Sequence, residues 1–140
     1  MTAAIALLLT VTMAILVRRD FFSGRMDTIT LVLLPGERSN ISGNIIRVPP
    51  GRHWIVLSIN IGGKASTEYS ATIASPEHGE IRRFARLHPL RTARQSLRLS
   101  MRLDSALLQT GNYSLMVFPL DENSSLPIGG YSFSVILNHH

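Results

Sequence analysis

Apolar and polar residues alternate in short runs from Asp27 onward. The clearest run, 95–103, places four apolar residues in one phase and three polar residues in the other: Leu97, Leu99, Met101 and Leu103 against Arg98, Ser100 and Arg102. A period of two is that of a β-strand, whose successive side chains point to opposite faces of a sheet, and a helix cannot use it. The segment is therefore predicted to be a strand with one buried and one exposed face.

Other short β-rich runs follow one another along the chain. They occupy residues 27–34, 44–48, 53–61, 68–75, 112–118 and 131–137. Turn-forming residues, Gly and Pro above all, separate most of them. Segment 80–87 is ambiguous between a strand and irregular structure. In the strongest run, 53–61, Trp54 and Val56 share one phase and Ile55 and Leu57 the other.

These runs predict the fold class. Seven or eight strands with no helical pattern between them are typical of an all-β domain. We expect an immunoglobulin- or fibronectin-III-like antiparallel β-sandwich over residues 27–137, followed by a tail at 138–140. A parallel α/β sheet is disfavoured because its crossover helices are missing from the pattern.

Three local expectations accompany this fold. Residues 104–109 are predicted to contain a single helical turn with Asp104 or Ser105 as its cap. Tyr113, which follows Gly111 and Asn112, predicts a tyrosine corner, in which the hydroxyl group bonds to the nearby backbone. Trp54 is expected to lie in the core, as tryptophan commonly does in such sandwiches.

The N-terminal segment has a different character. The first 17 residues, MTAAIALLLTVTMAILV, contain no charged residue, Pro or Gly. As a helix they would span about 25 Å, near the short end of what a hydrocarbon core of about 30 Å requires. We predict a retained transmembrane anchor, or signal anchor, over 1–19, and a linker over 20–26. A cleaved signal peptide and a buried core helix remain as alternatives.

The side of the membrane is left open by this segment alone. Arg18, Arg19 and Arg25 lie on the C-terminal side of the apolar stretch. The positive-inside rule would therefore keep the main domain in the cytoplasm. This count loses its meaning if a cytoplasmic segment precedes Met1.

Candidate catalytic and metal-binding motifs are sparse. The chain has no cysteine, which excludes disulfides, thiolate nucleophiles and cysteine-ligated zinc. No histidine pair with metal-ligand spacing, no Gly-x-Ser-x-Gly and no Gly-rich phosphate loop occurs inside the predicted domain. We therefore expect a protein that is not an enzyme, with no metal, cofactor or small-molecule substrate. Asp121-Glu122 and His139-His140 are interpreted as a solvated loop and a frayed tail.

The charge pattern supplies the one candidate site. The formal net charge is +5, and seven arginines fall between positions 82 and 102. We single out six of them as candidate contacts to an anionic lipid, polymer or other anionic surface: Arg82, Arg83, Arg86, Arg94, Arg98 and Arg102. The alternative is a solvated face that discourages edge-to-edge pairing. Nucleic acid is disfavoured because Phe84 is the only aromatic residue among them.

Several local phrases resemble the extracytoplasmic β-sandwich region of bacterial membrane-bound proteins related to anti-sigma factors. The phrases are Leu33-Leu34-Pro35-Gly36, Val48-Pro49-Pro50-Gly51 before Trp54-Ile55-Val56-Leu57, Leu107-Leu108 with Gly111-Asn112-Tyr113-Ser114-Leu115, and Gly130-Tyr131-Ser132-Phe133-Ser134-Val135. The resemblance covers roughly residues 27–137. It implies a membrane-anchored outer domain that senses or binds something, on the outer, periplasmic side. The zinc-binding N-terminal half of that family is absent, so sigma-factor binding is not carried over.

Together these observations predict a single-pass membrane protein whose main domain is extracytoplasmic and acts as a non-enzymatic binding or sensing domain. It contacts the membrane through residues 1–19 and has an unknown protein partner. A structural module that pairs through an exposed edge strand is the main alternative. An enzyme that assembles its site from scattered residues is a third hypothesis.

Overall fold

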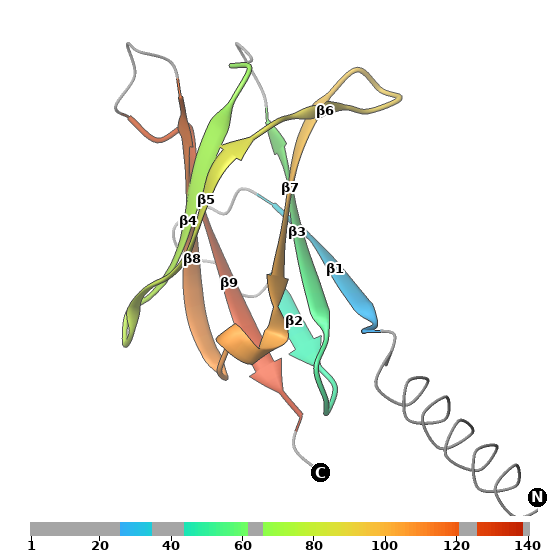
Figure 1. Cartoon of the computed structure of the whole chain (residues 1–140), viewed down its shortest axis with the longest axis vertical. Coiled ribbons are helices and arrows are strands. Elements are labelled where there is room, and N and C mark those ends of the chain that lie inside the picture. The colour runs from blue at the N-terminus through green and yellow to red at the C-terminus, as the bar shows by residue number, and fades with distance from the viewer. Residues whose placement is uncertain (1–25, 35–43, 62–65, 121–125, 139–140) are drawn as a thin grey trace, which may run out of the picture.

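A computed structural model describes residues 26–34, 44–61, 66–120 and 126–138, and the structural statements below concern these residues. Their strands form two facing sheets (Figure 1). The strands are β1 (Thr28–Leu33), β2 (Ile45–Val48), β3 (Trp54–Ile61), β4 (Tyr69–Ser75), β5 (Gly79–Leu87), β6 (Leu90–Arg91), β7 (Leu97–Asp104), β8 (Gly111–Pro119) and β9 (Gly129–Leu137). One short 3-10 helix, η2 (Ser105–Leu107), follows β7.

The strand order confirms the predicted all-β sandwich and corrects its detail. The first sheet has the order β1-β3-β7-β6, and the second has the order β2-β9-β8-β4-β5. We predicted purely antiparallel sheets, but β1 is parallel to β3 and β2 is parallel to β9. A parallel pair needs a crossover connection, which is usually a helix. Here the connection from β1 to β3 instead passes through β2 of the opposite sheet, so strands of the second sheet replace the helix.

The core lies between the two sheets and follows the predicted alternation. In β7, Leu99, Met101 and Leu103 are buried while Arg98, Ser100 and Arg102 are exposed. In β3, Ile55, Leu57 and Ile59 are fully buried. The second sheet adds aromatic residues, and the rings of Tyr113 and Phe133 stack with centroids 5.4 Å apart. Burial of each such side chain contributes about 1.5–3 kcal/mol. The prediction that Trp54 is a core residue is wrong, because Trp54 shares the outward phase of Val56 and is only half-buried.

Strand β5 explains why its sequence was ambiguous. Its partly buried residues are Ile81, Phe84 and Leu87, a spacing of three that fits neither a regular strand nor a helix. The pairing of β5 with β4 shifts register twice. Each shift inserts an extra residue into β5 and so resets the side-chain alternation. Arg86, at one of these irregularities, has a positive φ of 55°.

The two predicted local motifs at the end of β7 and the start of β8 are confirmed. Asp104 caps η2, because its Oδ1 accepts a hydrogen bond of 2.9 Å from the backbone N–H of Ala106. The hydroxyl of Tyr113 accepts from the N–H of Gln109 at 2.7 Å and donates to the Gln109 carbonyl at 2.9 Å. These bonds form the tyrosine corner, which fixes the entry of the chain into β8.

Several predictions fall on segments outside the described residues. These segments are 1–25, 35–43, 62–65, 121–125 and 139–140. They contain the predicted anchor over 1–19, most of the linker, the Asp121-Glu122 pair and the His139-His140 tail. Among the described residues, no helix has both the length and the apolar character needed to cross a bilayer.

Candidate anion-binding surface

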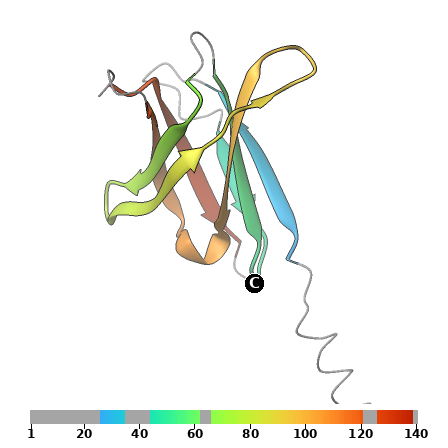
Figure 2. The ribbon, with the colours of Figure 1, turned by 45° about the horizontal axis from the view of Figure 1, so that its top comes forward.

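The six predicted arginines lie on three neighbouring parts of the fold. Arg98 and Arg102 are on the outer face of β7 in the first sheet. Arg82, Arg83 and Arg86 are on β5, the outermost strand of the second sheet. The chain passes directly from β5 into the hairpin of β6 and β7, which carries Arg94 in its turn (Figure 2). All six are exposed, but they do not form one flat face.

The β6–β7 hairpin sets the directions of its arginines. Its turn is closed by a 2.8 Å bond from the N–H of Thr92 to the Ser96 carbonyl and a 2.9 Å bond from the N–H of Gln95 to the Thr92 carbonyl. Gln95 has a positive φ of 59°, as expected of a three-residue hairpin loop. The register places Leu90 opposite Arg98 and Arg91 opposite Leu97. Arg91 therefore lies on the other face of the hairpin from Arg98.

Few carboxylates neutralise these arginines. Arg83 pairs with Glu80 at 2.7 Å, and the Arg82 guanidinium lies over the ring of Phe84 at 5.7 Å from its centroid. Within the described ranges, no ion pair involves Arg86, Arg94, Arg98 or Arg102. The surface of β5, β6 and β7 is thus rich in unpaired guanidinium groups, which produce a positive potential around it.

An additional group on the outer face of the first sheet was missed by sequence reasoning. The guanidinium of Arg102 lies over the ring of Trp54, at 4.4 Å from the ring centroid. The register pairs Trp54 with Asp104 and Val56 with Arg102, which makes Trp54 and Arg102 diagonal neighbours. The signal was available, since Trp54 has the phase of Val56 rather than that of Ile55. The general preference of tryptophan for the core of such sandwiches does not hold at this position.

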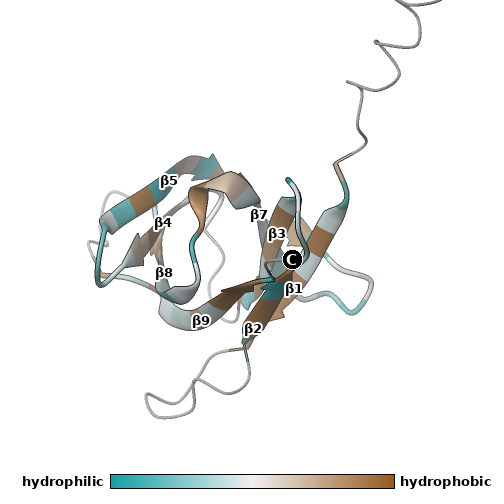
Figure 3. Cartoon of the chain, turned by 90° about the horizontal axis from the view of Figure 1, so that it is seen from below, coloured by the Kyte–Doolittle hydropathy of each residue, from teal (hydrophilic) through white to brown (hydrophobic). Residues whose placement is uncertain are grey.

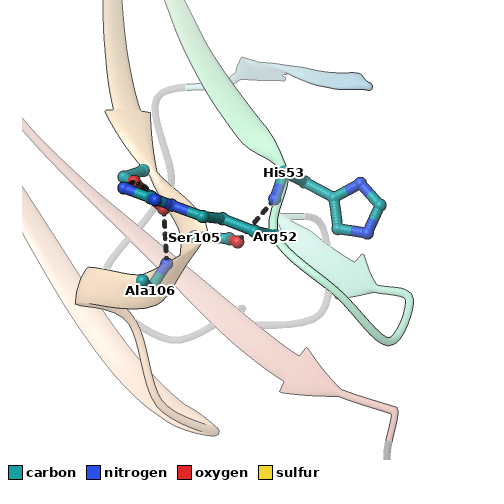
Figure 4. Close-up of polar contacts among 5 residues, drawn as sticks. Arg52, His53, Ser105 and Ala106 are labelled. Carbon is teal, nitrogen blue, oxygen red and sulfur yellow. Dashed lines mark hydrogen bonds and ion pairs between the residues drawn. The ribbon is translucent and has the colours of Figure 1, made fainter. Parts of the chain in front are cut away.

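Asp104 lies two residues after Arg102 on the same face of β7, and it pairs with Arg52. The Nε of Arg52 donates to Oδ2 of Asp104 at 2.7 Å, and its Nη2 forms an ion pair with the same oxygen. These bonds, together with the N–H of Ala106, lower the pKa of Asp104, and Asp104 in turn raises the pKa of Arg52. We call this ion pair the Arg52–Asp104 clasp. Beside it, the Oγ of Ser105 accepts a hydrogen bond of 2.9 Å from the His53 N–H (Figure 4).

Two hollows lie at the same end of the sandwich as this clasp. One, of about 260 Å³, is lined by residues 75–78 and 109–113, and contains a contact of 3.2 Å between His78 Nε2 and Gln109 Oε1. The other, of about 370 Å³, is lined by residues 48–52, 105–106, 108 and 137–138. Across the described part of the chain, no group of three or more His, Asp or Glu side chains is arranged to hold a metal ion.

Comparisons with known proteins give little further information. No family model matches the chain, and no curated protein matches it. Among solved structures, it resembles reduced rusticyanin, with a TM-score of 0.39 and 9% sequence identity over 79% of this chain and 80% of that one. We draw no functional conclusion from a likeness at this level.

Proposed function

We propose that the sandwich is a non-enzymatic binding or sensing domain that presents its arginines to an anionic partner. The observation that carries this proposal is the set of six exposed arginines, of which only Arg83 pairs with a carboxylate among the described residues. Guanidinium groups recognise carboxylates and phosphates through two parallel hydrogen bonds, and unpaired groups on one side of a domain attract anions over several ångströms.

In this proposal residues 1–19 hold the domain at a membrane as a single-pass anchor, and the domain lies on the outer side. The uncharged and mostly apolar sequence before Arg18 supports the anchor. The resemblance to the outer region of anti-sigma-factor-like proteins supports the location and suggests a signalling role. Because the chain has no cysteine, a Ser132→Cys variant provides a single reporter at an exposed position of β9. A membrane-impermeant maleimide labels it in intact cells if the domain is outside, and only after lysis if it is inside.

The anion-binding proposal is tested with two versions of the full chain in mild detergent. One replaces all six arginines with serine, and the other replaces them with lysine. Retention on immobilised dextran sulfate is measured as the salt concentration rises. We expect the serine variant to elute at much lower salt than the parent and the lysine variant to fall between them, because lysine keeps the charge and loses the planar fork. Equal elution of parent and serine variant would remove the proposal and favour a merely solvated face.

A second candidate function is strand pairing with a partner through β1. Of the four outermost strands in the described sheets, β6 has two residues, β2 has four and is followed by Pro49-Pro50, and β5 is irregular and charged. Strand β1 has six residues, no charge and no proline, and it pairs with β3 in unbroken register. It therefore lacks the features that usually protect a sheet edge from strand addition.

A further inference from the structure

The outer face of the first sheet carries a more specific arrangement than a diffuse positive charge. Arg102 is stacked on Trp54, and no acid pairs with it in the described ranges because Arg52 binds Asp104. Stacking covers one side of the guanidinium and restricts its motion, while its N–H edge can still donate. A guanidinium held in this way loses less conformational entropy when it binds a carboxylate than a free arginine does.

A second guanidinium lies along the same strand and the same face. Arg98 and Arg102 are four residues apart on β7, which corresponds to roughly 13 Å at the rise of a strand. The surface between them mixes small polar and apolar side chains, and none of its described residues is acidic. Val56 lies opposite Arg102, and exposed Val32 of β1 lies beside Ser58. Ser100 lies midway and shares a hydrogen bond of 3.0 Å with Ser58 of β3, and Asn60 lies directly opposite Arg98 in the register.

The chemistry of this face limits the class of ligand. A stable protein interface needs a broad apolar, well-packed centre, whereas the valines of this face are interspersed with Ser100, Asn60 and two arginines. Single-stranded nucleic acid needs free aromatic platforms, whereas the ring of Trp54 is occupied by Arg102. A hydroxyl group between two guanidinium groups, with an amide beside one of them, suits a polymer that has many hydroxyls and regularly spaced carboxylates.

We infer that the outer face of β3 and β7 binds an acidic polysaccharide. Carboxylates of two of its sugars contact Arg98 and Arg102, and its hydroxyl groups contact Ser100 and Asn60. This inference rests on the proposed anion-binding function and assigns a place and a ligand class to it. Arg82, Arg83 and Arg86, on β5 at the edge of the second sheet, then contribute only long-range attraction.

Trp54 provides the readout, since it is the only tryptophan of the chain and lies directly under Arg102. The full chain in mild detergent is titrated with oligomers of galacturonic acid while Trp54 fluorescence is recorded. The same oligomers with methyl-esterified carboxyl groups, polyglutamate and vesicles containing phosphatidylglycerol are titrated in parallel. We expect a saturable change with the acidic oligomers, little change with the esterified ones, and weaker binding of polyglutamate and vesicles.

Two matched double variants locate the site. Arg98→Ser with Arg102→Ser is expected to weaken binding of the acidic oligomers tenfold or more, since it removes charge-assisted hydrogen bonds. Arg82→Ser with Arg83→Ser removes the same charge from β5 and is expected to weaken binding less than threefold. Arg102→Lys, which keeps the charge, is expected to lose most of the binding and guards against a folding defect of the double variant.

Three results would overturn the inference. They are the absence of a saturable change, equal losses in the two double variants, and tighter binding of polyglutamate or of the vesicles than of the acidic oligomers. Equal losses, combined with release of the six-serine variant from dextran sulfate at low salt, would leave the proposed anion-binding function intact. An unchanged six-serine variant would remove both.

Discussion

The two flanks of the sandwich differ in pairing, charge and regularity. One flank, formed by β1 and β2, contains both parallel pairings, and Arg47 is its only charged residue. The other, formed by β5 and β6, is antiparallel, has two register shifts and carries four arginines. Figure 3 shows hydrophobic bands along β1, and hydrophilic bands interrupted by hydrophobic ones on β5. We call them the apolar flank and the basic flank.

The two flanks differ in how well they resist the addition of another strand. The charge and the irregular backbone of β5 disfavour the addition of a strand to the basic flank. Its arginine side chains remain exposed to solvent. The apolar flank has no such protection on β1. A separate feature of this flank is a link between the two sheets. The side chain of Asn44 bonds to the backbone of Leu34, after β1, and to the Ser132 carbonyl in β9.

The largest expected effect concerns this Asn44 link. Asn44 is buried and makes three hydrogen bonds to backbone groups, at 3.3, 3.2 and 3.0 Å. Its replacement by alanine leaves those groups without partners and should lower the free energy of unfolding by about 3 kcal/mol. Asn112→Ala, which removes one exposed bond to Ser134, serves as the control and should cost well under 1 kcal/mol. Urea unfolding followed by Trp54 fluorescence measures both, and equal losses would show that Asn44 does not join the sheets.

A lysine placed on β1 tests whether this edge strand pairs with a partner strand. If β1 pairs with a partner strand, Thr30→Lys should abolish the pairing, because a lysine on an exposed edge disfavours strand addition. Ser132→Lys places the same charge on β9, an interior strand of the second sheet, and should have no effect. Crosslinking of the full chain in detergent reports the pairing. A pairing that survives Thr30→Lys, or that fails in both variants, would exclude β1 as its site.

A substitution in the turn between β6 and β7 is expected to raise the free energy of unfolding, by less than Asn44→Ala lowers it. Gln95 holds a left-handed backbone conformation with φ of 59°, which favours glycine. Gln95→Gly should therefore raise the free energy of unfolding by about 1 kcal/mol. Ala93→Gly, two residues earlier in the same turn, relieves no such strain and should lower it slightly. Thermal unfolding of both variants checks this, and destabilisation by Gln95→Gly would contradict the assigned turn.

The smallest effect is a pH dependence at the Arg52–Asp104 clasp. Hydrogen bonds from Arg52 and from the Ala106 N–H lower the pKa of Asp104 in the folded protein. The stabilisation is complete above the pKa of an unfolded aspartate, about 3.9, and is lost as the pH falls below it. Asp104→Asn should therefore flatten the acid limb of the curve of unfolding free energy against pH. An unaltered acid limb in Asp104→Asn would mean that the clasp does not contribute.

The sequence predicted the parts of the fold that depend on local periodicity. The alternation in β7, the cap at Asp104 and the corner at Tyr113 are set by neighbouring residues and were predicted correctly. The parallel pairing of β1 with β3 was not, because strand order depends on contacts between segments far apart in the chain. Strand β5 was ambiguous because its bulges conceal the period of two.

The candidate site was predicted in part for the same reason. Counting arginines located the basic stretch, since they are close together in the sequence. The stacking of Arg102 on Trp54 and the capture of Asp104 by Arg52 join residues about fifty positions apart. No periodic pattern relates such residues, so these contacts became visible only when β3 and β7 were placed side by side.

The most direct test of the account compares the outer face of β3 and β7 with the apolar flank in one experiment. Amide hydrogen exchange of the full chain in mild detergent is measured with and without a saturating acidic polysaccharide. Protection concentrated in β3 and β7, with β1 and β2 unchanged, is the result that binding on the outer face of β3 and β7 predicts. Protection confined to β1 and β2, or no protection in any described strand, would contradict it.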